Sequence, residues 1–92
     1  MIVCKFKISG KVQGVNFRYN AKRMAKKLGV RGFVMNHLDG TVIGEVEGKI
    51  ESVKKFKKIL SAGSKRAKVE NCIFFDQQDI EDHFYYNFFI AK

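Results

Sequence analysis

Two short runs of this 92-residue chain have the residue types and spacing that could do chemistry. The first, residues 10–18, has glycines at its bends and ends in Arg18, where a helix is expected to begin. Glycine lets backbone N–H groups turn toward one point, and both a helix N-terminus and a guanidinium attract phosphate oxygens. This run therefore predicts a site for a phosphate-sized dianion that needs no metal. On its chemistry alone it is equally compatible with a tight strand-to-helix turn in which Arg18 is solvated.

The second run, residues 32–40, ends a predicted strand on an uncharged amide, Asn36, next to a turn at Asp39 and Gly40. A carboxamide forms hydrogen bonds through its oxygen and nitrogen but cannot act as a strong base. Taken alone, Asn36 is most readily interpreted as a strand-end amide that satisfies the turn. Neither run contains a poised nucleophile, since the chain has no Cys-x5-Arg loop for a phosphocysteine and no Asp-x-Asp motif for a phosphoaspartate.

The other reactive side chains are interpreted as structural. The sequence shows no obvious catalytic triad that could include His37 or His83. Asp39, together with Gly40, is assigned to forming the turn rather than to acting as a base. Cys4 and Cys72 fall in alternating strand patterns, where ordinary buried thiols are favoured over a disulfide bridge or a redox pair. They also lack the spacing of metal ligands. We therefore expect neither a metal nor a cofactor.

The elements that must position these runs follow from the spacing of the apolar residues. Alternation over residues 2–9 predicts a half-buried strand, and helical spacing from Phe17 to Leu28, stopped by Gly29, predicts a helix. The order is βαββαβ with an extra C-terminal strand. Two helices on one face of an antiparallel sheet form the ferredoxin-like α+β sandwich. The other predicted elements are strands at 30–36, 41–47, 69–75 and 85–90, a helix from after Gly48 to near Gly63, and a polar loop at 76–82.

Size and composition predict one small domain over residues 1–92, with 46% hydrophobic residues to form its core. No signal peptide or membrane-spanning stretch is recognisable, so we expect a soluble, cytoplasmic monomer. The net charge is +9, from 18 basic and 9 acidic residues. A field of this sign attracts anions. Much of the charge falls on predicted helix surfaces, where solvated faces are favoured over a dedicated binding patch.

The two runs together resemble a known family. Gly-x-Val-Gln-Gly-Val-x-Phe-Arg at residues 10–18 and Gly-Phe-Val-x-Asn-x-x-Asp-Gly at residues 32–40 closely resemble the two signatures of acylphosphatases. Two motifs at the family's spacing are a specific signal. The family's fold is the same ferredoxin-like sandwich. The resemblance extends to the closing Phe88 and Ile90, through Glu47, Gly48, Phe56, Leu60, Gly63 and Val69.

The resemblance implies a metal-free hydrolase that converts acyl phosphates to a carboxylate and inorganic phosphate. Arg18 and the backbone amides of residues 13–18 would hold the phosphate oxygens, and Asn36 would orient the attacking water. No residue of the two motifs is expected to recognise the acyl group of the substrate, so the expected substrates are acyl phosphates as a class. The implied catalytic residues are Arg18 and Asn36, and the implied phosphate-binding residues are Gln13, Gly14, Val15, Asn16, Phe17 and Arg18.

The sequence departs from the family pattern at two positions. Asn16 occupies a position that often holds glycine, and Met35 stands where an arginine commonly precedes the catalytic asparagine. Because Arg18 and Asn36 are intact, we expect Met35 to weaken substrate attraction or a surface ion pair rather than to abolish turnover.

Two alternatives compete with this interpretation. A single-stranded RNA-binding module of the same architecture would use the basic charge, the many aromatic residues and Arg31-Gly32-Phe33, which echoes the start of a ribonucleoprotein signature. That signature belongs on the third strand, whereas here it falls on the second, so nucleic acid is not the expected partner. The other alternative is a regulatory domain that binds acyl phosphate without hydrolysing it.

Overall fold

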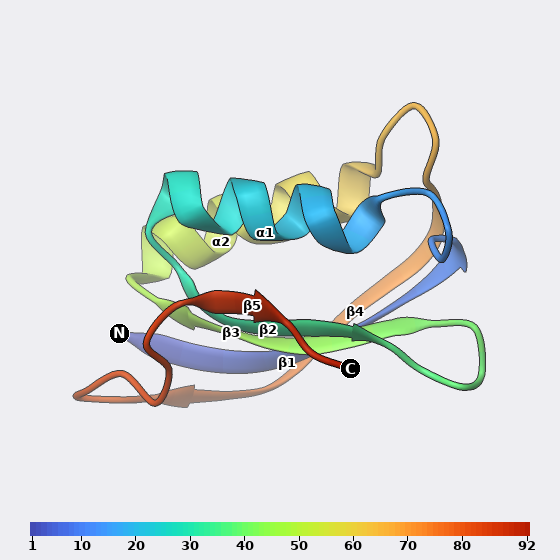
Figure 1. Ribbon diagram of the computed structural model, residues 1–92. Coiled ribbons are helices and arrows are strands. Elements are labelled where there is room, and N and C mark those ends of the chain that lie inside the picture. Colours follow the sequence, from blue (N-terminus) through green and yellow to red (C-terminus); the bar gives the residue numbers. More distant parts are fainter.

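The computed structural model describes all 92 residues and places two helices on one face of a five-stranded sheet (Figure 1). No helix is long and apolar enough to cross a membrane. The strands are β1 (Ile2–Lys11), β2 (Arg31–Asn36), β3 (Val42–Gly48), β4 (Lys68–Asp79) and β5 (Phe88–Ile90), and the helices are α1 (Phe17–Leu28) and α2 (Ile50–Ala62).

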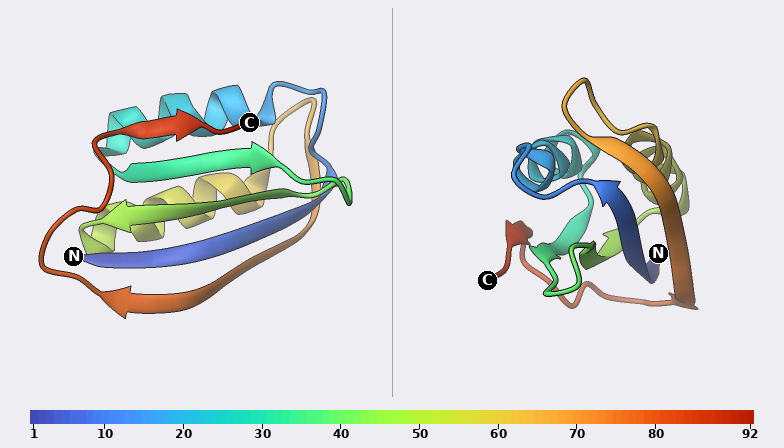
Figure 2. Two further views of the ribbon diagram at one scale, coloured as in Figure 1. Left: turned by 60° about the horizontal axis from the view of Figure 1, so that its bottom comes forward. Right: turned by 90° about the vertical axis from the view of Figure 1, so that its right-hand side faces the viewer.

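The strand order β4-β1-β3-β2-β5 confirms the predicted ferredoxin-like sandwich. Strand β1 pairs antiparallel with both β3 and β4, and β2 pairs antiparallel with β3. Strands β4 and β5 lie at opposite edges, so the segment between them crosses one end of the sheet (Figure 2). After that crossing β5 runs parallel to β2, which makes the sheet mixed rather than wholly antiparallel.

The core lies between the helices and the sheet face that they cover. Alternation along β1 buries Cys4, Phe6 and Ile8, as the period of two predicts. The ring of Phe56 from α2 packs 6.3 Å from that of Phe6 and 5.3 Å from that of Phe88, measured between centroids. Burying each of these aromatic side chains stabilises the fold by about 2–3 kcal/mol. The helices contribute Phe17, Ala21 and Ala25 from α1, and Val53, Phe56 and Leu60 from α2.

Several boundaries differ from the prediction because strand pairing extends beyond the local pattern. Strand β1 passes through a register shift at Ser9 and continues to Lys11, paired with β4. Gly10, predicted as a loop residue, is therefore a strand residue with φ +124, and a Cβ there would collide with the carbonyl oxygen of Lys68. Strand β4 continues to Asp79, into the first half of the loop expected at 76–82, and the last strand starts only at Phe88.

A buried carboxylate fixes the segment that crosses from β4 to β5. Glu47, at the end of β3, is fully buried and accepts a hydrogen bond from the backbone N–H of Phe84 at 2.9 Å. The N–H of Tyr85 lies 3.4 Å from its Oε2, and Nδ1 of His83 lies 2.5 Å from the same oxygen. One side chain therefore satisfies several donors of a loop that has little secondary structure of its own.

Glu47→Ala is expected to destabilise the protein by about 3 kcal/mol, because it leaves the partly buried N–H groups of this loop without their acceptor. Urea denaturation followed by circular dichroism measures the change in the free energy of unfolding. The control is Glu81→Ala, an exposed residue of the same loop, which should change stability by less than about 0.5 kcal/mol. Equal stabilities for the two variants would contradict the role assigned to Glu47.

Candidate active site

The loop between β1 and α1 turns on two residues with left-handed backbone conformation. Gly14 has φ +73, and Asn16, the residue that caps α1, has φ 61 and ψ 20. The Asn16 side chain makes no capping hydrogen bond. No hydrogen bond within the protein uses the backbone N–H groups of residues 13–18. These donors, together with the positive end of the α1 dipole, are thus free to bind an anion.

Arg18 lies in the first turn of α1, directly beside these donors. Its side chain is half-buried and takes part in none of the ion pairs of the structure. The first turn of α1 also contains no acidic residue. An unpaired guanidinium at a helix N-terminus favours a ligand with two or more negative oxygens. Arg18 lines a hollow of about 220 Å³ together with Val12, Gly14, Asn16, Phe17, Tyr19 and Ile90.

Asn36 is the last residue of β2 and carries the one buried side-chain polar atom that has no hydrogen-bond partner, its Oδ1. A buried carbonyl oxygen without a donor costs about 1–3 kcal/mol, so such an atom favours binding a water or a ligand group. Alternation along β2 puts Asn36 on the same face as the buried Val34, which is the face that the helices cover. Asn36 therefore combines an unsatisfied acceptor with a position on the Arg18 side of the sheet.

Met35 lies on the other face of β2. It pairs with Ile43 of β3 and is half-buried on the side that carries no helices. Met35, one of the two departures from the motif pattern noted in the sequence, therefore does not share a sheet face with Asn36.

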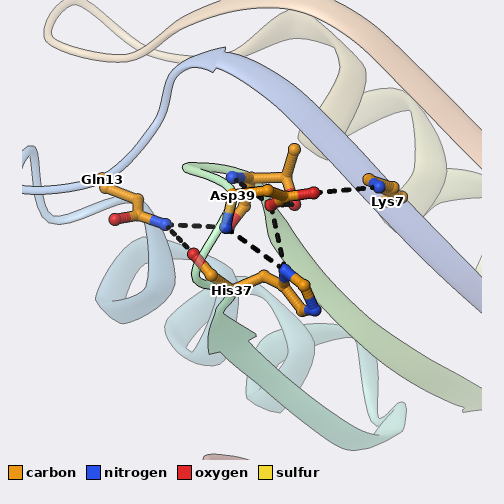
Figure 3. Close-up of polar contacts among 5 residues, drawn as sticks. Lys7, Gln13, His37 and Asp39 are labelled. Carbon is orange, nitrogen blue, oxygen red and sulfur yellow. Dashed lines mark hydrogen bonds and ion pairs between the residues drawn. The ribbon is translucent and has the colours of Figure 1, made fainter.

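Gln13 joins the β1–α1 loop to the hairpin that follows Asn36 (Figure 3). Its Nε2 donates to the carbonyl oxygens of His37 and Thr41, both at 2.9 Å. A second connection lies directly after β5, where the N–H of Ala91 donates to the carbonyl of Val34 on β2 at 2.9 Å. The residue before it, Ile90, lines the hollow. The loop before Arg18 and the end of β2 are thus held at the same end of the molecule.

The hairpin itself is ordered by Asp39. Its Oδ1 accepts hydrogen bonds from the hydroxyl of Thr41 at 2.6 Å and from the backbone N–H of Thr41 at 3.0 Å, and its Oδ2 pairs with Nζ of Lys7 at 3.1 Å (Figure 3). These hydrogen bonds from Thr41, followed by the interaction with Lys7, hold the pKa of Asp39 well below its usual range. A carboxylate of such low basicity is a poor general base, which agrees with its assignment to the turn.

The remaining reactive groups lie away from the candidate site or are inert. Nδ1 of the exposed His37 lies 3.1 Å from Oδ1 of Asp39, and His83 contacts Glu47 near the opposite end of β3. Both cysteines are free, Cys4 buried and Cys72 half-buried. Burial raises the pKa of each thiol, which keeps both protonated and unreactive.

Not every predicted phosphate-binding residue lines the hollow that contains Arg18. Gly14, Asn16 and Phe17 do, whereas Val15 faces a neighbouring hollow. The side-chain Nε2 of Gln13 is committed to the hairpin, so its backbone N–H is the one donor that this residue still offers to an anion. The sequence analysis missed this bridging role. A glutamine inside a glycine-containing run carries no local signal for partners 24 and 28 residues away.

Comparison with known proteins gives consistent matches over nearly the whole chain. A family model described as Acylphosphatase matches residues 4–90. Acylphosphatase-1 of Drosophila melanogaster is 42% identical over 88 residues, which cover 95% of this chain and 73% of that protein. The acylphosphatase of Thermotoga maritima is 42% identical over 71 residues, 77% of this chain and 79% of that protein. The crystal structure of acylphosphatase from Bacillus subtilis superposes over the full length of both chains with a TM-score of 0.92 and 28% identity.

Proposed function

The chain belongs to the acylphosphatase family, and from that premise we propose how its own residues carry out the reaction. The enzyme hydrolyses the carboxyl–phosphate anhydride of small acyl phosphates to a carboxylate and inorganic phosphate. This assignment does not favour the alternative of an RNA-binding module. The identity of the residues that act on the substrate is our proposal.

Arg18 and the backbone N–H groups of residues 13–18 bind the phosphoryl group. The guanidinium donates to two of its three non-bridging oxygens, and the free N–H groups donate to the third and complete the shell around the other two. As the bond to the carboxylate breaks, negative charge is redistributed over these oxygens and the leaving group. Fixed donors stabilise that distribution without reorganising, which is the main source of catalysis in such a site.

Asn36 orients the attacking water through its carboxamide. The unpaired buried Oδ1 is the observation that carries the proposal, because it needs a donor and a water molecule supplies one. With one water O–H donated to Oδ1, a lone pair of the water oxygen is directed at phosphorus, in line with the leaving carboxylate.

The reaction does not require a strong general base. Carboxylate is a good leaving group and phosphoryl transfer passes through a loose transition state, in which little bonding to the attacking water has formed. The water proton can therefore leave late, to solvent or to the phosphoryl oxygens. The low pKa of Asp39, the nearest carboxylate in the hairpin after Asn36, supports a mechanism that makes no use of a protein base.

We further propose that the enzyme works without a metal ion. The groups gathered at the site are a guanidinium, backbone N–H donors and a single carboxamide, none of which is a typical ligand set for a divalent cation. Phosphate release from benzoyl phosphate should therefore proceed at the same rate with and without excess EDTA. Inhibition by the chelator that added metal reverses would contradict a metal-free site. Absence of phosphate release under any condition would contradict the function itself.

Residues 1–92 are proposed to act as one acylphosphatase-like domain and as a cytoplasmic monomer. A single core of 17 buried residues draws on both helices and on the sheet, which supports one cooperative unit. The two free thiols fit a reducing compartment. The net charge of +9 opposes association of identical copies.

A further inference from the structure

A second hollow adjoins the one that contains Arg18. It lies between the first half of α1 and the loop from α2 to β4, and its volume is about 560 Å³. The two hollows share Asn16 and Tyr19 in their walls. Figure 1 shows the α2–β4 loop beside the segment that enters α1, at the same end of the molecule. Besides Asn16 and Tyr19, the lining of the second hollow includes Arg23, Ser64, Lys65 and Arg66.

Three cations line this hollow and have no acidic partner. None of the ion pairs of the structure involves Arg23, Lys65 or Arg66. By contrast, Lys5 and Lys7 on the open face of the sheet pair with carboxylates at 3.6 and 3.1 Å. Like charges held together without compensation repel one another, and that repulsion is relieved when an anion binds among them.

The walls of the hollow are held in place by local structure. Tyr19 and Arg23 lie one helical turn apart and therefore on the same face of α1. The loop closes on itself: the N–H of Ser64 donates to the carbonyl of Ala67, and the N–H of Ala67 donates to Oγ of Ser64, both at 3.1 Å. Ala67 is buried in the core, which anchors the two basic residues that precede it.

We propose that this second hollow is a subsite for an anionic group on the acyl side of the substrate. The inference rests on the proposed function, because it takes the phosphoryl group to bind beside Arg18. An acyl group that leaves this position passes Asn16 and Tyr19 and reaches Arg23, Lys65 and Arg66. The enzyme therefore prefers acyl phosphates whose acyl part ends in a carboxylate or a second phosphate over those with a neutral acyl part.

Three substrates that share one scaffold test this preference: benzoyl phosphate, 4-carboxybenzoyl phosphate and 4-phosphonobenzoyl phosphate. The readout is the ratio of kcat/KM for each anionic substrate to kcat/KM for benzoyl phosphate. For the wild-type enzyme, each ratio should exceed the ratio of the rate constants for uncatalysed hydrolysis of the same two substrates. The preference should appear as a lower KM, since the subsite binds ground state and transition state alike. Whichever of the two ratios is larger shows whether the subsite prefers a carboxylate or a second phosphate on the acyl group.

The variant that tests the subsite is Arg23→Gln/Lys65→Gln/Arg66→Gln. All three residues are exposed, so the fold should be retained. We expect the substrate ratio to fall roughly tenfold. The matched control is Lys54→Gln/Lys55→Gln/Lys58→Gln, which removes the same charge from an exposed face of α2 that does not line the hollow. It should keep the wild-type ratio.

Two results would overturn the subsite alone: a wild-type enzyme with no preference for the anionic substrates, or an equal fall of the ratio in both triple variants. The second result would mean that only the overall field of the protein attracts the substrate. A wild-type enzyme that hydrolyses none of the three substrates would instead overturn the proposed function, and the subsite with it.

Discussion

Arg18→Gln is expected to reduce kcat/KM for benzoyl phosphate by roughly a thousandfold or more. Glutamine removes the only charged donor at the start of α1 and cannot present two parallel N–H groups to the phosphoryl oxygens. The side chain of Arg18 makes no ion pair in the structure, so its replacement should change the free energy of unfolding little. Steady-state kinetics and urea denaturation of the same preparation separate the two effects.

Arg18→Lys distinguishes charge from geometry. Lysine keeps the positive charge but loses the planar fork, so activity should remain almost as low as in Arg18→Gln. The control is Lys27→Gln, an exposed residue in the last turn of α1, whose activity should stay close to wild type. Full activity in either Arg18 variant would exclude this residue from the catalytic machinery.

Asn36→Ala is expected to reduce kcat by roughly a hundredfold to a thousandfold while leaving the binding of inorganic phosphate largely intact. The substitution removes the buried, unpaired Oδ1 to which we assign the attacking water. It leaves in place the backbone N–H groups of residues 13–18, to which we assign phosphate binding. The affinity for phosphate is measured by its competitive inhibition of residual turnover, or by calorimetry where turnover is too slow.

Asn71→Ala, at an exposed position of β4, serves as the matched control and should retain both turnover and phosphate binding. If Asn36→Ala lost phosphate binding and turnover in the same proportion, water positioning would not be its role. The residue would then belong to the phosphate-binding group or to the structural support of the loop.

Local patterns were sufficient to predict the elements of this fold. Alternation at Cys4, Phe6 and Ile8 and helical spacing at Phe17 and Ala21 each reflect one buried face, and the structure buries these side chains. Motif spacing also marked Arg18 and Asn36, which the fold brings to one end of the sheet through Gln13 and β5.

What the sequence did not predict depends on partners far away along the chain. Glu47 binds backbone groups 37 and 38 residues later, and no short pattern signals such a contact. The extension of β1 to Lys11 depends on pairing with Lys68 of β4, and the parallel direction of β5 depends on where the crossing segment returns to the sheet. The hollow lined by Arg23 and the α2–β4 loop likewise forms only when the helices are packed.

The position of β4 has a consequence for solubility. This 12-residue strand lies at an edge of the sheet, where its outer backbone groups have no neighbouring strand and its side chains include the exposed Ile73 and Phe75. A long edge strand is a template for aggregation between copies. The register shifts in its pairing with β1 make the edge irregular, and the net charge of +9 keeps molecules apart until salt screens it. Repulsion between the excess basic residues of different molecules thus also opposes aggregation through this edge strand.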